Sequence, residues 1–459
     1  MLYHLFVPLE EVLKGFRLFR YISFRAAFAA ILAFLVATVV GPGIVASLRA
    51  RKLAGTALTG SAAVDAERLR KSQVPTMGGV ILLIGVTLSS LLFARLDNAY
   101  TWATLVSFLA FGALGAVDDW RKLTVPKSQG ISERTKLVAQ VGIAVAVLAL
   151  LYGLGNAEDG TPWLRGARLK ESPYPKEWVK RHTVKEGETY AGLAREYLSD
   201  AGRAKELAER NGAVTPEGRV LTPVVGSTVS LPPLWPDPKD HHRADLQLPF
   251  SKRFCLDLGL LLIPFGVLVI VGASNAVNLT DGLDGLAIGC TATVAVTLTV
   301  AAYLVGRVDF SRDLYLFYVP EAGELAIIGA ALAGGALGFL WFNGFPATVF
   351  MGDTGSLAIG GILGVLAVAL RHEVTLLLAG GLFVGEALSV IWQRAWFKGT
   401  RRAARRRGDP AATGRRWFRC APIHHHFQQA GLHENKVTVR FWIVSVVCAL
   451  VALATLKVR

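Results

Sequence analysis

The sequence has few charged residues and few cysteines for its length. Only 18% of its 459 residues are charged and 53% are hydrophobic, whereas ordinary soluble domains carry roughly 25% charged residues. This composition argues against a large soluble domain and excludes intrinsic disorder. The four cysteines lie outside the most polar segment, residues 156–250 (the insert), so no disulfide staples it. The N-terminus also lacks the charged region and Ala-x-Ala-like site of a cleavable signal peptide.

Long apolar runs fill most of the chain. They cover residues 26–46, 77–94, 102–117, 137–155, 258–273, 286–305, 325–342, 357–370, 374–397 and 437–456. A helix of about 20 apolar residues crosses a bilayer, and the 47 glycines suit close packing between such helices. The sequence therefore predicts an all-α polytopic membrane protein with about ten transmembrane helices. A soluble fold would instead have to bury all of these runs in one core.

The positive charge of the chain lies in its membrane part. The net charge is +15, from 49 Lys and Arg against 34 Asp and Glu, and the insert contributes nothing because it holds 14 of each. Residues 394–440 carry 12 Lys and Arg against two acids. Since basic loops face the cytoplasm, we expect this segment inside and the insert and both termini outside. The excess then reflects topology and attraction for anionic lipids, and no nucleic-acid partner is expected.

Acidic motifs lie at predicted helix ends on the same basic face. Asp118 and Asp119 follow the third apolar run, where adjacent carboxylates indicate a metal, proton transfer or a cationic partner. Asp281 and Asp284 lie in a Gly-containing turn and can supply oxygen ligands or bind a sugar or base. Asp353 precedes a predicted helix. Mg²⁺ needs only one or two carboxylates plus substrate phosphates, so these loops together match a magnesium site.

Each acidic motif also has a structural interpretation. Asp118 and Asp119 could be a solvated pair balanced by Arg121 and Lys122, and residues 278–285 could be a simple turn between helices. The helix that follows Asp353 could be capped by Thr354 and Ser356, which would make this motif an N-cap only.

A histidine run and a lysine complete the polar motifs of this face. His424, His425 and His426 could contact a substrate phosphate or sugar, make structural hydrogen bonds, or bind a metal. Zinc is disfavoured because adjacent histidines on one regular element cannot all face one ion. Lys71 opens the second apolar run and could be a snorkelling anchor or a substrate contact.

Together these motifs resemble the polyprenyl-phosphate N-acetylhexosamine-1-phosphate transferase superfamily, and within it the phospho-N-acetylmuramoyl-pentapeptide transferases. The resemblance is carried by residues 75–79, 118–119, 278–285, 350–356, 422–427, 439–443 and 454–459, and it covers the chain outside the insert. It implies a ten-helix enzyme of the bacterial cytoplasmic membrane, with residues 1–155 and 251–459 forming the catalytic domain. The implied reaction is Mg²⁺-dependent transfer of phospho-MurNAc-pentapeptide from its UDP carrier to undecaprenyl phosphate, giving lipid I and UMP. A homodimer is implied as well.

The resemblance also implies roles for single residues. Asp353 would be the magnesium ligand, bordered by Asp118 and Asp119, and Asp118 would deprotonate the lipid phosphate before a direct attack. His424 would be a further catalytic residue, and Phe350 would stack on uracil. The substrate-binding positions would be Lys71, Thr76, Lys122, Asn278, Asp281, Gly282, Leu283, Asp284, Asn343, Phe350, His425 and His426.

Within the insert, residues 181–233 resemble a lysin-motif domain. The motif begins at His182, and its pattern predicts a strand, a glycine turn, two short helices and a return strand. This resemblance implies binding to the glycan of peptidoglycan, and a structured spacer is the alternative.

Two other functions stay open at this point. A related transferase that uses another UDP-N-acetylhexosamine would share the aspartate motifs, although the histidine motif favours the muramoyl-pentapeptide substrate. A transporter would also have many spans, but it would place polar residues near the bilayer midplane.

Overall fold

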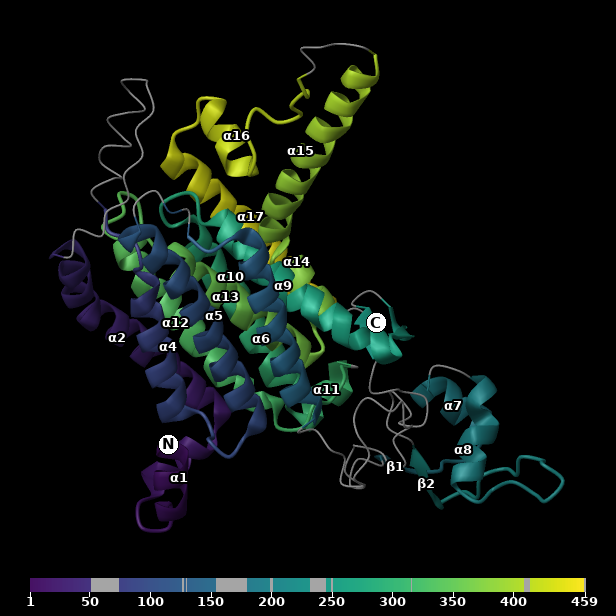
Figure 1. Ribbon diagram of the computed structural model, residues 1–459. Coiled ribbons are helices and arrows are strands. Elements are labelled where there is room, and N and C mark those ends of the chain that lie inside the picture. Colours follow the sequence, from purple (N-terminus) through teal and green to yellow (C-terminus); the bar gives the residue numbers. More distant parts are fainter. Residues whose placement is uncertain are drawn as a thin grey trace.

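The computed structural model describes residues 1–50, 74–125, 128, 130–153, 180–198, 201–231, 245–248, 251–314, 316–407 and 413–457. The described part of each predicted apolar run is helical, one of them as two helices, and these helices pack into one bundle (Figure 1). In the described part of the chain, 8 helices are long and apolar enough to cross a membrane. They are α2 (Ile22–Ala50), α5 (Ala99–Thr124), α6 (Glu133–Gly153), α9 (Leu262–Thr280), α10 (Leu286–Val305), α12 (Leu325–Asn343), α13 (Gly352–Leu370) and α17 (Glu434–Thr455).

Two of the expected spans are not continuous long helices. The run at 374–397 forms α14 (Glu373–Ala379) and α15 (Gly381–Arg406), which meet at an angle of 82°. The run at 77–94 forms α4 (Gly79–Phe93), whose 15 residues extend only about 22 Å at 1.5 Å per residue. By length and composition the described chain therefore has eight membrane-spanning helices, or nine if the bent pair is one span, rather than about ten.

Helices α12 and α13 form the centre of the bundle. In the most apolar 18-residue stretch of each helix, 94% of the α13 residues and 78% of the α12 residues are buried, the highest values among the spanning helices described. Small residues allow this close packing, since a Cβ on Gly334 would lie 2.0 Å from the carbonyl oxygen of Ala30 on α2. A Cβ on Gly360 of α13 would likewise lie 2.4 Å from the carbonyl oxygen of Ala273 on α9.

A buried ion pair holds one end of the bundle. Arg25 of α2 is only 1% exposed, and its guanidinium donates to both carboxylate oxygens of Glu324 at 2.7 Å. Glu324 ends the short helix η6 (Ala322–Glu324) and leads into α12. The N-terminal segment, α1 (Leu2–Phe6), η1 (Val7–Leu9) and η2 (Lys14–Arg20), folds back over the same end, where Tyr3 lies against the guanidinium of Arg25. This pair therefore fixes α2 against α12.

The described part of the insert forms the predicted strand, helix, helix and strand. These elements are β1 (Lys180–Thr183), α7 (Tyr190–Leu198), α8 (Ala204–Arg210) and β2 (Thr228–Leu231), with η4 (Ala201–Arg203) before α8. β1 pairs antiparallel with β2, and Val184, Leu193, Leu207 and Val229 form a core separate from that of the bundle. A second hairpin, β3 (Asp245–Leu248) and β4 (Ser251–Asp257), leads through η5 (Gly259–Leu261) into α9.

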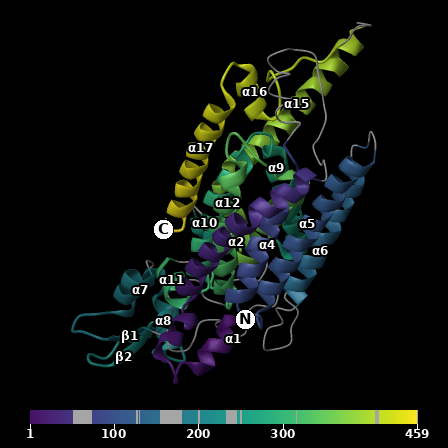
Figure 2. The same cartoon turned by 90° about the vertical axis from the view of Figure 1, so that its left-hand side faces the viewer.

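Figures 1 and 2 show the two ends of the bundle. The far end of α15, the short helix α16 (Ile423–Gln429) and the start of α17 lie at one end, whereas α1 and the insert helices α7 and α8 lie at the other. The remaining described helix, α11 (Val308–Leu314), lies in the connection between α10 and α12. The molecule therefore separates its most basic segment from its folded insert.

Candidate active site

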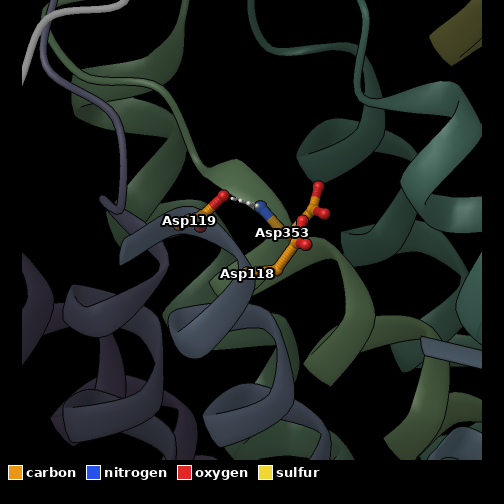
Figure 3. A group of neighbouring side chains, drawn as sticks. All are labelled: Asp118, Asp119 and Asp353. Carbon is orange, nitrogen blue, oxygen red and sulfur yellow. Dashed lines mark hydrogen bonds between the residues drawn. The ribbon is translucent and has the colours of Figure 1, made fainter. Parts of the chain in front are cut away.

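Three aspartates from two helices form an acidic cluster (Asp118, Asp119 and Asp353). The first two lie near the end of α5 and the third lies in the first turn of α13, as Figure 3 shows. One carboxylate oxygen from each residue lies within 4.8 Å of the other two. Residues 234 positions apart in the sequence thus meet, as the resemblance implied for Asp118, Asp119 and Asp353.

Asp119 caps the N-terminus of α13. Its Oδ1 accepts from the backbone N–H of Asp353 at 3.2 Å, and its Oδ2 accepts from the N–H and hydroxyl of Thr354 at 2.9 and 2.7 Å. The expectation that Thr354 and Ser356 cap this helix was wrong, because Thr354 donates to Asp119 and Ser356 donates to the carbonyl of Gly352. A carboxylate from α5 is the better cap because its charge also suits the positive end of the helix.

Two lysines balance the other two carboxylates. Lys122 Nζ lies 2.7 Å from Asp118 Oδ2 and 3.1 Å from Asp353 Oδ2. Lys136, near the start of α6, lies 2.8 Å from Asp118 and 2.5 Å from Asp353. The three carboxylates and two ammonium groups leave the cluster one negative charge in excess. Lys136 was not predicted from the sequence. The only indication there is its position at the start of a predicted helix, on the basic face.

Close backbone contacts hold the cluster in place. A Cβ on Gly115 of α5 would lie 2.1 Å from the carbonyl oxygen of Asp353, and a Cβ on Gly79 would lie 2.3 Å from the backbone nitrogen of Gly355. The segment before α4 also pairs with the segment before α13, since the N–H of Phe350 donates to Pro75 and the N–H of Gly78 donates to Phe350, both at 2.8 Å. This pairing explains why the glycines of residues 75–79 and 350–356 are needed.

Asn278 and Thr76 border the acidic cluster. Asn278, in the last turn of α9, donates from Nδ2 to Asp353 Oδ1 at 2.8 Å and to the Ser356 hydroxyl at 2.9 Å. Thr76 Oγ1 and Asp119 Oδ2 both lie close to Gly352: a Cβ built on this glycine would be 2.9 Å from the hydroxyl and 2.6 Å from the carboxylate oxygen. Both residues therefore lie at the cluster.

The loop of residues 281–285 has an accessible part and a buried part. Asp281 is half-buried and Gly282 is exposed, whereas Leu283 and Asp284 are buried. Burial, followed by the negative charges of Asp353 and Asp119, raises the pKa of Asp281 to about 8. The carboxyl group of Asp281 is thus close enough to the acidic cluster to be affected by its charge.

Asp284 and Asn343 tie the loop to its surroundings. Asp284 Oδ2 accepts from the N–H of Ala347 and its own N–H donates to Glu434 of α17, at 2.9 and 2.8 Å. Asn343 accepts from the N–H of Gly285 and donates to the carbonyl of Val349. These contacts shape the loop and the Phe350 segment together. Glu434 was not anticipated from the sequence.

The three adjacent histidines point to three different partners. His424 is fully buried and its Nδ1 lies 3.1 Å from Glu386 Oε2, whereas Nδ1 of His425 lies 2.7 Å from Gln428 Oε1. His426 Nδ1 accepts from the backbone N–H of Arg419 at 3.1 Å. His424 lies against the 281–285 loop, since a Cβ on Gly282 would lie 2.3 Å from its Nε2.

The structure thus brings most of the predicted residues to one end of the bundle. Lys71 lies outside the described residues. Among the described residues, the acidic cluster is the one group of three or more His, Cys, Asp or Glu arranged to hold a metal ion, and the histidines form no such group. Its donors are carboxylate oxygens, the type that Mg²⁺ prefers, so the residues present fit a divalent cation.

Comparison with known proteins identifies the family of the chain. Residues 239–371 match the model of glycosyl transferase family 4. A phospho-N-acetylmuramoyl-pentapeptide-transferase of Citrifermentans bemidjiense is 38% identical over the full length of both chains. The protein of that name from Thermodesulfovibrio yellowstonii is 35% identical over the full length of both, and that from Dinoroseobacter shibae is 39% identical over 97% of this chain and 96% of its own.

A helical membrane bundle with a buried carboxylate cluster and the family 4 match define a polytopic membrane transferase. The full-length relatives narrow this class. The chain belongs to the phospho-N-acetylmuramoyl-pentapeptide transferase family. The comparisons support this resemblance, and they give no support to a lysin motif in the insert.

Proposed function

We propose that the acidic cluster is the place where this chain carries out the reaction of its family. As a member of that family the chain forms lipid I in peptidoglycan synthesis. The substrates are UDP-MurNAc-pentapeptide and undecaprenyl phosphate, and UMP is released. The observation that carries the site is the convergence of Asp118, Asp119 and Asp353, with Lys122 and Lys136 between them.

In this proposal Asp353 holds Mg²⁺, with Asp118 and Asp119 beside it. Asp353 has the greatest side-chain exposure of the three aspartates, at 15%, whereas both oxygens of Asp119 already accept hydrogen bonds from α13. Mg²⁺ bound there would neutralise the phosphate charges of both substrates.

The residues of the chain would align two polyanionic substrates. Lys122 and Lys136 reach the same carboxylate oxygens and can turn to substrate phosphates. Asp118, pinned by the N–H of Ile131 at 2.6 Å, would accept the proton of the lipid phosphate. An oxygen of that phosphate then bonds to the phosphorus attached to MurNAc, and the bond from this phosphorus to the UMP oxygen breaks. Alignment of the two phosphates supplies much of the rate.

The loops around the cluster would hold the nucleotide sugar. Thr76, Asn278, Asp281, Gly282, Phe350 and His424 are proposed to contact it, with Phe350 stacking on uracil. Leu283, Asp284 and Asn343 are buried and are proposed to act by shaping the 281–285 loop. Lys71, His425 and His426 stay proposed substrate contacts, the two histidines from the edge of the site.

The proposed topology places the acidic cluster on the cytoplasmic side of the bacterial inner membrane. The basic end of α15 and the histidine segment lie at that end of the bundle (Figure 1). Counting α4 and the bent α14–α15 pair as crossings gives about ten spans, with both termini and the insert outside. A homodimer is proposed from the family.

The insert is proposed to bind peptidoglycan glycan as a domain of its own. Its strand, helix, helix and strand arrangement and its separate core support a folded module. Retention of the full-length protein on peptidoglycan, compared with a variant in which residues 181–233 are replaced by a short linker, tests this. Equal retention would favour a structured spacer.

The proposed chemistry is tested with purified protein in detergent. UMP release should require both substrates and a divalent cation, stop on chelation and resume on addition of Mg²⁺. Release that continues in excess chelator would contradict the role of the acidic cluster.

A further inference from the structure

A buried glutamate lies beside His424, the histidine that packs against Gly282 of the 281–285 loop. Glu386 of α15 and His424 of α16 are both fully buried, and Glu386 Oε2 lies 3.1 Å from His424 Nδ1. The second oxygen of Glu386 and Nε2 of His424 have no hydrogen-bond partner among the described residues. This glutamate has no place in the chemistry described above.

We propose that Glu386 is a positioning residue that orients His424 toward the nucleotide sugar. The inference rests on the proposed role of His424 at the 281–285 loop. The ring is held at Nδ1 by Glu386 and presents Nε2 across Gly282, where a Cβ would lie only 2.3 Å from that nitrogen. A side chain at position 282 would therefore clash with the imidazole ring of His424.

The partner of Nδ1 decides the tautomer of the His424 ring, and so the hydrogen-bonding role of Nε2. A carboxylate only accepts hydrogen bonds, so Glu386 keeps the ring proton on Nδ1. Nε2 is then the nitrogen that can accept a hydrogen bond from a substrate group. The neighbouring histidines have weaker or different partners at Nδ1, a Gln428 side chain for His425 and a backbone N–H for His426. Their rings are thus not held in the same orientation.

A purely structural role explains this arrangement poorly. A buried carboxylate costs desolvation that apolar packing between α15 and α16 would avoid. A buried nitrogen without a hydrogen-bond partner adds a further desolvation cost. A substrate hydroxyl or amide N–H that donates to Nε2 would offset that cost, whereas a purely structural contact would leave it in place.

The test is a double-mutant cycle on the full-length enzyme with kcat and KM for UDP-MurNAc-pentapeptide as readouts. Glu386→Met keeps the side-chain volume and removes both the charge and the acceptor, and it should lower kcat/KM roughly 10- to 100-fold. His424→Ala should lower it similarly, and the double variant should be no worse than His424→Ala alone. Glu386→Gln, whose amide oxygen can still accept from Nδ1–H, should recover part of the loss.

Glu373→Gln is the matched control, because Glu373 is also a buried glutamate but lies on α14. It should leave kcat/KM unchanged, and Tm should show that each variant is folded. If Glu386→Met does not fold, Glu386→Gln takes its place in the cycle.

Losses that multiply in the double variant, or equal losses for Gln and Met, would overturn the positioning role. Wild-type activity of Glu386→Met beside an impaired His424→Ala would overturn it as well and leave the proposed function intact. Wild-type activity of His424→Ala would remove His424 from the site and the inference with it.

Discussion

Replacing Asp353 by Asn tests the acidic cluster most severely. The cluster holds three carboxylates against Lys122 and Lys136, so the substitution takes its charge from one negative to zero. A divalent cation and a carboxylate about 4 Å apart attract by roughly 8 kcal/mol at an effective dielectric constant of ~20. If desolvation offsets about two thirds of this, the remaining ~2.7 kcal/mol is ~100-fold in affinity. Asn keeps the volume and can still accept from Asn278 through its amide oxygen.

The assay is UMP release as a function of Mg²⁺ concentration. We expect the half-saturating Mg²⁺ concentration to rise ~100-fold and kcat at saturation to fall by ~10²- to 10³-fold. Asp309→Asn is the control, since Asp309 pairs with Arg307 near the start of α11 and should leave both values unchanged. A folded Asp353→Asn variant with wild-type Mg²⁺ dependence would refute the reasoning.

Three further perturbations follow from the geometry. Asp281 is neutral below its pKa of about 8 and becomes anionic above it, where it repels the pyrophosphate. The value of kcat/KM should therefore fall as pH rises through 8, and Asp281→Asn should flatten that fall. A pH profile that is the same in the variant and the wild type would contradict this. The methyl group of Gly115→Ala would press against the backbone of Asp353, so this variant should lose ~1–3 kcal/mol of folding stability and most of its activity. In Gly142→Ala the methyl group meets no atom within 4 Å, so this control should be neutral. Equal effects of the two substitutions would contradict the packing. Arg25→Met leaves Glu324 buried without its partner and should cost ~3–5 kcal/mol, seen as a lower Tm, which an unchanged Tm would exclude.

The helices and the acidic motifs could be predicted because their causes are local. Each apolar run of sufficient length forms a helix in any membrane fold, and the turn chemistry of the insert, with Gly187 at φ +83°, is written in neighbouring residues. The lengths of the helices were harder to predict. Helix α4, for example, begins only after the preceding residues have paired with the Phe350 segment. The bend between α14 and α15 falls at Gly380 and Gly381, a pair of glycines that can interrupt an apolar helix.

The contacts that define the site could not be predicted from the residues alone. Asp119 caps a helix that begins more than 230 residues later, and Lys136 meets Asp353 across 217 positions. Glu386 looks from its sequence like any acid within an apolar run, and only the packing of α16 against α15 reveals its partner. Local patterns thus named the chemistry, whereas tertiary packing decided which side chains act together.

The central claim is tested most directly by offering two nucleotide sugars to the purified protein with undecaprenyl phosphate and Mg²⁺. The account predicts UMP release and lipid I formation with UDP-MurNAc-pentapeptide and little release with UDP-N-acetylglucosamine. Equal release with both sugars would contradict the substrate assignment, and no release with either would contradict the proposed site as a whole.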